Sequence, residues 1–166
     1  GRYLAEAGAT VAFYLLKPRD SQTDENFARV EEMGLEVLLA EYDQRYRVLR
    51  HRLRITDFVI DALLGTGASR PITGALAGLM EQIAAGMAEI AAPSARPPSL
   101  ISVAEPPRLP EDADARPSRP VVIAVDCPSG LNCDTGALDP LSIPADMTVT
   151  FAGPKRGHFL FPGATA

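Results

Sequence analysis

The chain lacks long apolar runs, has few cysteines and carries no excess of positive charge, and each absence excludes a class of function. No uninterrupted apolar segment approaches the roughly 20 residues of a membrane-spanning helix, so we expect no membrane partner. The formal net charge of −5 argues against a general nucleic-acid partner. The two cysteines, Cys127 and Cys133, have no metal-ligand spacing and fit free thiols in a reducing compartment. With no signal peptide visible, we expect a cytoplasmic location.

The 166 residues, 46% of them hydrophobic, predict a single domain, 1–166, with a sizeable core. Its strands alternate with helices, which predicts an α/β fold with a mostly parallel sheet covered on both faces. We expect strands over 10–16, 37–40, 58–62, 121–125 and 147–151. We expect helices over 21–33, with Ser21 or Thr23 as N-cap, and over 42–53 and 73–90, and the first few residues also read as part of a helix.

The stretch 93–120 departs from this alternation. It is rich in proline, alanine, serine and charged residues, and its one apolar run is 100–103. We interpret it as a flexible insertion and a disordered surface loop. The alternative is a partner-binding segment anchored by the apolar run.

The organising stretch is 121–132, VVIAVDCPSGLN. Five apolar, mostly β-branched residues suit a buried parallel strand, which stops at Asp126 and a Pro-Ser-Gly turn. Ligands of open α/β sheets bind beyond the carboxyl ends of the strands, so this carboxylate faces a possible site. The alternative for a lone aspartate at a strand end is that it caps its own turn.

A second strand repeats this pattern. It carries Asp61 near its end and leads into the turn Gly65-Thr66-Gly67, with Arg70 shortly after. Glycines permit a tight turn and close approach to a ligand, and free N–H groups there would bind a phosphate. Alone, Gly-x-Gly is more often only a turn. If the two strands are neighbours, both carboxylates reach one rim, where one pKa rises unless a cation lies between them.

Together these segments resemble the NAD(P)H-hydrate epimerase family, also called the YjeF N-terminal domain family. The resemblance rests on motifs that occur in the family's order and span most of the chain. They are DALLGTG (61–67) with Arg70-Pro71-Ile72 and Gly74, AVDCPSGLN (124–132) with Asp134-Thr135-Gly136, TVTF (148–151), Pro154-Lys155, Gly157, and Pro162-Gly163.

The resemblance implies a Rossmann-like three-layer α/β/α sandwich and an isomerase that interconverts the R and S epimers of NADHX or NADPHX in cofactor repair. It implies that Asp61 and Ser129 help to hold a potassium ion, for which oxygen donors are suited. It implies that Asp126 contacts the hydrated nicotinamide. The implied substrate-binding segment is Gly65, Thr66, Gly67, Ala68, Ser69, Arg70 and Pro71.

For the mechanism we expect Asp126 to act as general acid/base at the ring hydroxyl, through reversible ring opening or through water loss that gives a cationic intermediate. Lys155 is a possible phosphate or carboxyl contact, but we interpret it, like His158, as a solvated side chain. Cys127 and Cys133 are interpreted as small packing residues, because no histidine or further thiol is placed to activate them.

Three further expectations follow from the resemblance. An Asn/Gly-rich loop precedes the first helix in the family, so we expect a domain truncated before Gly1 and possibly after Ala166. The family also implies a homodimer and a fused or separate NAD(P)HX dehydratase. The alternative function is a non-catalytic dimeric scaffold or protein-interaction module on the same fold.

Overall fold

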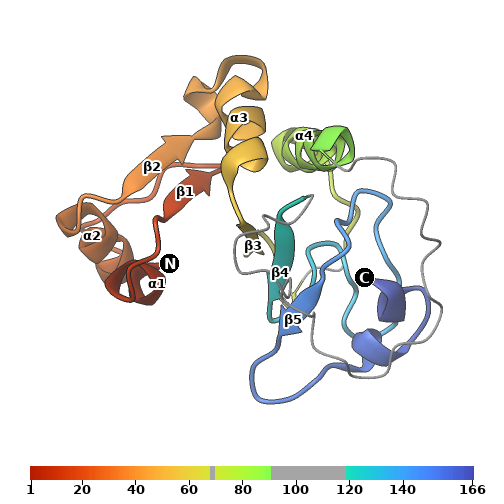
Figure 1. Cartoon of the computed structure of the whole chain (residues 1–166). Helices are drawn as coiled ribbons and strands as arrows, with labels where there is room; N and C mark the ends of the chain where they lie inside the picture. Colours follow the sequence, from red (N-terminus) through yellow and green to blue (C-terminus); the bar gives the residue numbers. More distant parts are fainter. Residues whose placement is uncertain (68–69, 91–118) are drawn as a thin grey trace, which may run out of the picture. The chain divides into compact units, whose positions relative to one another are not determined.

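The structure, a computed structural model, describes residues 1–67, 70–90 and 119–166 (Figure 1). These residues form two compact units, Gly1–Leu49 and Arg50–Ala166. Of the insertion expected over 93–120, residues 93–118 lie outside the described part of the chain.

The first unit contains the expected β-α-β order. Its two strands pair in parallel, with Ala12 opposite Glu36 and Leu15 opposite Leu39. The helix between them begins after Asp24, whose carboxylate accepts a hydrogen bond of 3.0 Å from the N–H of Phe27. Its N-cap is therefore Asp24, and the expected Ser21 or Thr23 is wrong. The elements are α1 (Arg2–Glu6), β1 (Ala12–Leu15), α2 (Glu25–Glu32) and β2 (Glu36–Leu39).

The helix expected over 42–53 begins later than the sequence pattern indicated. Arg45 and Tyr46 have φ angles of 56° and 54°, which interrupt the helix. Asp43 then caps the following turn, because its carboxylate accepts hydrogen bonds from the N–H groups of Val48 (3.0 Å) and Leu49 (2.9 Å). The stretch becomes η1 (Ala40–Tyr42), η2 (Gln44–Tyr46) and α3 (Arg47–Ile55).

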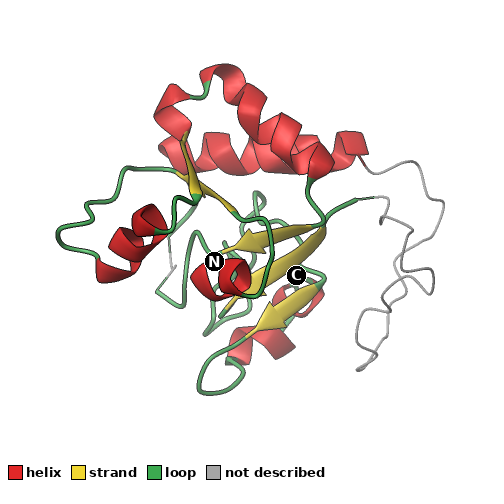
Figure 2. Ribbon diagram, turned by 60° about the vertical axis from the view of Figure 1, so that its left-hand side comes forward, coloured by secondary structure: helices red, strands yellow, loops and turns green. Residues whose placement is uncertain are grey.

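The second unit is built on a three-stranded parallel sheet of order β3-β4-β5 (Figure 2). Asp61 lies opposite Ala124, which in turn lies opposite Thr148. The carboxyl ends of the three strands therefore meet at one edge of the sheet, as expected for the strands of Asp61 and Asp126. The elements are β3 (Phe58–Asp61), α4 (Gly74–Ile90), β4 (Val121–Val125), β5 (Met147–Val149), η3 (Arg156–Phe159) and η4 (Gly163–Thr165).

The two faces of this sheet differ in burial. On one face Val122 and Ala124 are 1% and 0% exposed. On the other, Ile60 and Met147 flank Ile123 in register and are 44% and 38% exposed. The second face is thus apolar and open to solvent.

Helix α4 buries its apolar side within the second unit. Leu79, Met80, Ile83 and Met87 are all buried, so the methionines are core residues as expected. Gly86 packs so closely that a Cβ there would lie 2.8 Å from Leu53 Cδ1. No helix within the described ranges is both long and apolar enough to cross a membrane.

Candidate functional site

Strand β4 ends in a strained turn centred on Asp126. The N–H of Cys127 donates to the carbonyl of Val125 at 2.9 Å, which closes a three-residue turn. Asp126 has a φ of 71°, in the left-handed region. Aspartate tolerates this region better than most residues. Asp126 also donates its N–H to the Val149 carbonyl at 2.8 Å, which fixes the turn against β5.

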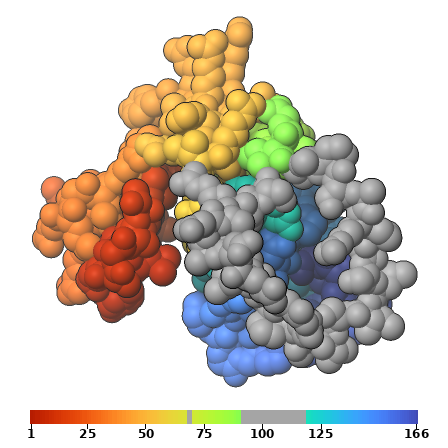
Figure 3. Space-filling model, viewed as in Figure 1, coloured from red at the N-terminus to blue at the C-terminus, as the bar shows by residue number. Residues whose placement is uncertain are grey.

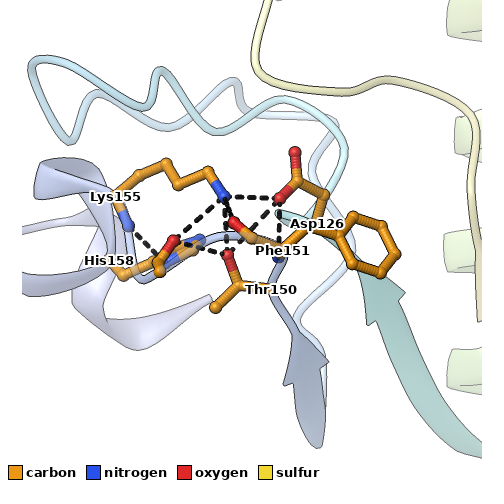
Figure 4. Close-up of polar contacts among 6 residues, drawn as sticks. Asp126, Thr150, Phe151, Lys155 and His158 are labelled. Atoms are coloured by element: carbon orange, nitrogen blue, oxygen red, sulfur yellow. Dashed lines mark hydrogen bonds and ion pairs between the residues drawn. The ribbon is translucent and has the colours of Figure 1, made fainter.

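The carboxylate of Asp126 is held by a cation and a backbone N–H (Figure 4). Its Oδ1 accepts from Lys155 Nζ at 2.6 Å, from the Phe151 N–H at 3.2 Å, and from Thr150 Oγ1 at 3.4 Å. The hydrogen bond from Lys155, followed by that from Phe151, lowers the pKa of Asp126 below its ordinary value of 3.8. Asp126 is therefore ionised at neutral pH, and 20% of its side chain is exposed.

Lys155 is enclosed by oxygen atoms. Besides Asp126, its ammonium donates to Thr150 Oγ1 at 2.8 Å and to the carbonyls of Phe151 at 2.7 Å and Gly153 at 3.0 Å. Only 21% of the side chain is exposed. The interpretation of Lys155 as a solvated lysine is wrong, because its ammonium exchanges most of its water contacts for these four acceptors.

The loop that carries Lys155 packs directly on the segment that follows Asp126. The N–H of Gly157 donates to the Cys133 carbonyl at 2.7 Å. A Cβ at Gly157 would lie 2.5 Å from the Asn132 carbonyl oxygen, closer than atoms can approach. Glycine at position 157 therefore allows the close contact that brings Lys155 to Asp126.

His158 is also part of this cluster, and its interpretation as a solvated side chain is wrong. Its Nδ1 accepts the N–H of Lys155 at 3.2 Å. Its Nε2 is buried and has no hydrogen-bond partner among the described residues. Burial, and then the charge of Lys155, lower the pKa of His158, so the imidazole is neutral at pH 7. It lines a cavity of about 290 Å³ together with Thr150.

The surface beside this cluster is aromatic. Phe151, Phe159 and Phe161 are 59%, 68% and 77% exposed. They belong to the segment after β5, coloured blue, parts of which lie at the surface in Figure 3.

Asp61 and Ser129 form a separate, buried pair. Asp61 Oδ1 accepts from Ser129 Oγ at 2.6 Å, and Oδ2 accepts from the Ser129 N–H at 2.8 Å. Ser129 Oγ in turn accepts from the N–H of Leu64 at 3.0 Å. Asp61 is 5% exposed and Ser129 0%. Within the described ranges Asp61 makes no ion pair, so a buried carboxylate is balanced there by neutral donors only.

The glycine-rich turn borders an open cavity. The cavity measures about 370 Å³, and the charged residue among the described residues that line it is Arg70. Neither Gly65 nor Gly67 has a positive φ, and a Cβ at either would meet no atom within 4 Å. The protein's own packing therefore does not require these glycines. Thr66 and Pro71 lie in the described residues before and after this turn, whereas Ala68 and Ser69 lie outside the described residues.

The two cysteines are buried packing residues, as expected. Cys127 and Cys133 are free thiols, 1% and 6% exposed, in a cluster with Leu131. Burial, and then a hydrogen bond with Cys133, raise the pKa of Cys127 to about 12. A thiol with such a pKa is not a nucleophile at neutral pH.

The two expected acids thus take different partners. Asp61 pairs with Ser129 in the interior, while Asp126 pairs with Lys155 at the accessible rim. From the sequence we expected one carboxylate to have a raised pKa unless a cation lay between the two, whereas the structure shows an ammonium bound to Asp126 and a lowered pKa there. Lys155 was missed as a site residue, although Pro154-Lys155 and Gly157 belong to the motifs that carried the resemblance.

Comparison with known proteins gives concordant matches. The bifunctional NAD(P)H-hydrate repair enzyme Nnr of Thermofilum pendens is 32% identical over 166 residues, which cover 98% of this chain and 25% of that protein. The NAD(P)H-hydrate epimerase of Limosilactobacillus fermentum is 33% identical over 105 residues, 63% of this chain and 35% of that protein. The chain thus spans about a quarter to a third of the length of these two relatives.

The family match covers nearly all of the chain. The model of the YjeF-related protein N-terminus matches residues 1–157. This agrees with the parallel strands and helices of the structure, which has the α/β, Rossmann-like class of fold expected from the sequence. The chain belongs to the family of YjeF-related protein N-termini.

Proposed function

We propose that this chain forms the catalytic domain of an NAD(P)H-hydrate epimerase, an isomerase that interconverts the R and S forms of NADHX or NADPHX. The observation that carries the proposal is the Asp126–Lys155 ion pair, at 2.6 Å, at the carboxyl end of β4. Both side chains are about one-fifth exposed, so they are fixed by the protein and still accessible to a ligand. The names of the two relatives support the choice of reaction.

In the proposed mechanism Lys155 carries out the proton transfers and Asp126 stabilises the charge that develops on the ring. The lowered pKa of Asp126 makes it a poor acid at neutral pH, so we revise its expected role as proton donor. Lys155 donates a proton to the ring hydroxyl, which leaves as water and gives a cationic ring. The carboxylate of Asp126 stabilises this cation. Water then adds to either face of the ring and returns its proton to the Lys155 amine, which restores the starting state of the protein.

The cavity beside Arg70 is the proposed place of the phosphates. An arginine matches phosphate oxygens in charge and geometry. The open space at Gly65 and Gly67 leaves room for a ligand to approach the backbone. The substrate would then extend from Arg70 to Asp126, with its phosphates at the first and its nicotinamide at the second.

We also propose that Asp61 and Ser129 hold a potassium ion. The donor set fits, since both side chains supply oxygen atoms and Asp61 is a buried carboxylate without a charged partner among the described residues. A bound cation would supply positive charge and local order at the start of the glycine-rich turn.

Assembly is part of the same proposal. The relative from T. pendens is named a bifunctional repair enzyme. We infer that this domain works with a dehydratase, either fused or separate, and that it forms a homodimer.

The test is the rate of epimerisation of purified R-NADHX, measured with and without potassium. We would compare the chain, a version extended N-terminally through an Asn/Gly-rich loop, and Asp126→Asn in the active background. The control is Glu31→Gln, an exposed carboxylate on α2. Asp126→Asn should lower kcat about 100-fold or more, as for loss of a preorganised charge that stabilises the transition state, whereas the control should not. Full activity of Asp126→Asn would contradict the assignment.

A further inference from the structure

Two side chains from the segment that follows β4 bind the backbone on both sides of the glycine-rich turn. We call the described residues up to 67 its first flank and those from 70 onwards its second flank. Ser129 Oγ accepts the N–H of Leu64 at 3.0 Å on the first flank. Asp139 Oδ2 accepts the N–H of Ile72 at 2.8 Å on the second. Leu64 and Ile72 both line the cavity of about 370 Å³, so each hydrogen bond fixes one part of its wall.

Asp139 is itself firmly placed. Its Oδ1 accepts the N–H of Leu141 at 2.9 Å, and its own N–H donates to the Gly130 carbonyl at 3.0 Å. The carboxylate therefore uses one oxygen for its own turn and the other for Ile72. A carboxylate that accepts two backbone N–H groups in this way is a rigid connection between two segments.

Gly130 shows how closely these segments pack. It has a φ of 98°, and a Cβ there would lie 3.1 Å from Asp139 Cβ and 3.2 Å from Ile72 Cδ1. Ile72 is 8% exposed, so the contact is part of the core. The turn that contains Ser129, the turn that begins at Asp139 and the second flank of the cavity thus meet at one point.

We propose that Asp139 is a positioning residue for the phosphate-binding cavity. By holding Ile72, it fixes the position of Arg70, two residues earlier, relative to the turn that carries Ser129. Loss of Asp139 then weakens binding of a phosphate-bearing nucleotide and leaves the chemistry at Asp126 and Lys155 intact. The identity of the ligand as a dinucleotide rests on the proposed function, whereas the fixing of Ile72 does not.

The experiment compares Asp139→Ala and Asp139→Asn with the unmodified chain. The matched control is Asp134→Ala, which removes an exposed aspartate from the neighbouring loop. The probe is NADP⁺, titrated by calorimetry, and hydrogen exchange of the Ile72 amide is measured without ligand. Where the protein turns over R-NADHX, KM and kcat are measured separately, and thermal unfolding reports global stability.

Asp139→Ala should weaken NADP⁺ binding and raise KM about tenfold or more, as for loss of a hydrogen bond to a charged group, with kcat within about twofold. Exchange at Ile72 should accelerate by a similar factor. The KM, the NADP⁺ affinity and the Ile72 exchange rate of Asp139→Asn should lie between those of Asp139→Ala and those of the unmodified chain. The single amide oxygen of asparagine can still accept one of the two N–H groups. Asp134→Ala should change none of these values.

The possible failures are distinct. If Asp139→Ala binds NADP⁺ as tightly as the unmodified chain, or if Ile72 exchange is unchanged, the role of Asp139 is wrong. If the loss follows a general fall in unfolding temperature and Asp139→Asn shows no rescue, Asp139 is only structural and the proposal is overturned. If the unmodified chain accelerates no epimerisation and binds no NADP⁺, while Asp139→Ala still loosens Ile72, the proposed function fails and the fixing of Ile72 stands.

Discussion

Lys155 Nζ lies 2.6 Å from Asp126 Oδ1, although 29 positions separate the two residues in the sequence. The ammonium is held there by three further oxygen atoms, from Thr150, Phe151 and Gly153. The pair thus joins the end of β4 to the loop after β5, and several measurable properties depend on it.

Replacing Lys155 by methionine should abolish most of the proposed activity while the fold is retained. Methionine keeps much of the length of the side chain but supplies neither a proton nor a positive charge. We expect kcat in the active protein to fall about 100-fold or more, the usual range for a lost acid/base group. Lys17→Met is the control, since Lys17 is exposed and is the only other lysine in the chain. Comparable rates for Lys155→Met and Lys17→Met would show that Lys155 has no role in proton transfer.

The backbone at position 126 can be tested separately from its carboxylate. Asp126→Gly and Asp126→Ala both remove the carboxylate, but only glycine adopts a φ of 71° without steric cost. Asp126→Ala should therefore be less stable than Asp126→Gly by about 1 kcal/mol, the cost of the left-handed region for a residue with a Cβ. Urea denaturation measures the difference. Equal stability of the two variants would mean that the turn relaxes to a negative φ.

His158 should give a distinctive proton NMR titration. Burial and the charge of Lys155 lower its pKa, so the midpoint of its ring-proton titration should lie below the ordinary value of 6.5. The chain has two histidines, and a His51→Gln variant assigns the signals. Because the unfolded chain binds this proton more readily, His158 stabilises the fold above about pH 6.5 and this contribution is lost as the pH falls below it. A His158 pKa at or above 6.5 would contradict the buried, neutral state.

Removing the hydroxyl of Ser129 should destabilise the second unit. The hydroxyl donates to Asp61 and accepts from Leu64, so Ser129→Ala leaves a buried carboxylate and a partly buried N–H each without one partner. We expect a loss of about 1 to 3 kcal/mol in the free energy of unfolding. Ser142→Ala is the matched control, because the Ser142 Oγ is buried and has no hydrogen-bond partner among the described residues. That variant should lose no stability, because the hydroxyl that it removes makes no hydrogen bond among the described residues. Similar losses in both variants would show that volume, rather than hydrogen bonding, determines the effect.

Much of the second unit was predictable because its signals are local. The apolar run before Asp126, the run before Asp61 and the glycine-rich turn indicated parallel strands with functional ends, and the register of β3 with β4 confirms their adjacency. The burial of Asp61 against Ser129 was not predicted, because we expected Asp61 to lie beside Asp126 at one rim of the sheet.

The missed features depend on long-range or backbone details. Periodicity places Tyr42 in a helix, but nothing local shows that Arg45 takes a left-handed φ and ends that pattern. The enclosure of Lys155 depends on the contact of Gly157 with Asn132, and the role of Asp139 depends on a hydrogen bond across 67 positions. Such contacts are set by how segments pack, and spacing along the chain does not reveal them.

The enclosure of Lys155 also has a consequence for chemical reactivity. Acylating reagents attack the lone pair of an amine, and the Lys155 nitrogen is hydrogen-bonded to four oxygen atoms with only 21% of its side chain exposed. The chain has two lysines, of which Lys17 is exposed, so mild acetylation followed by mass spectrometry should modify Lys17 first. Modification of Lys155 should follow more slowly, and its rate relative to that of Lys17 would measure how firmly the loop after β5 holds the Lys155 ammonium.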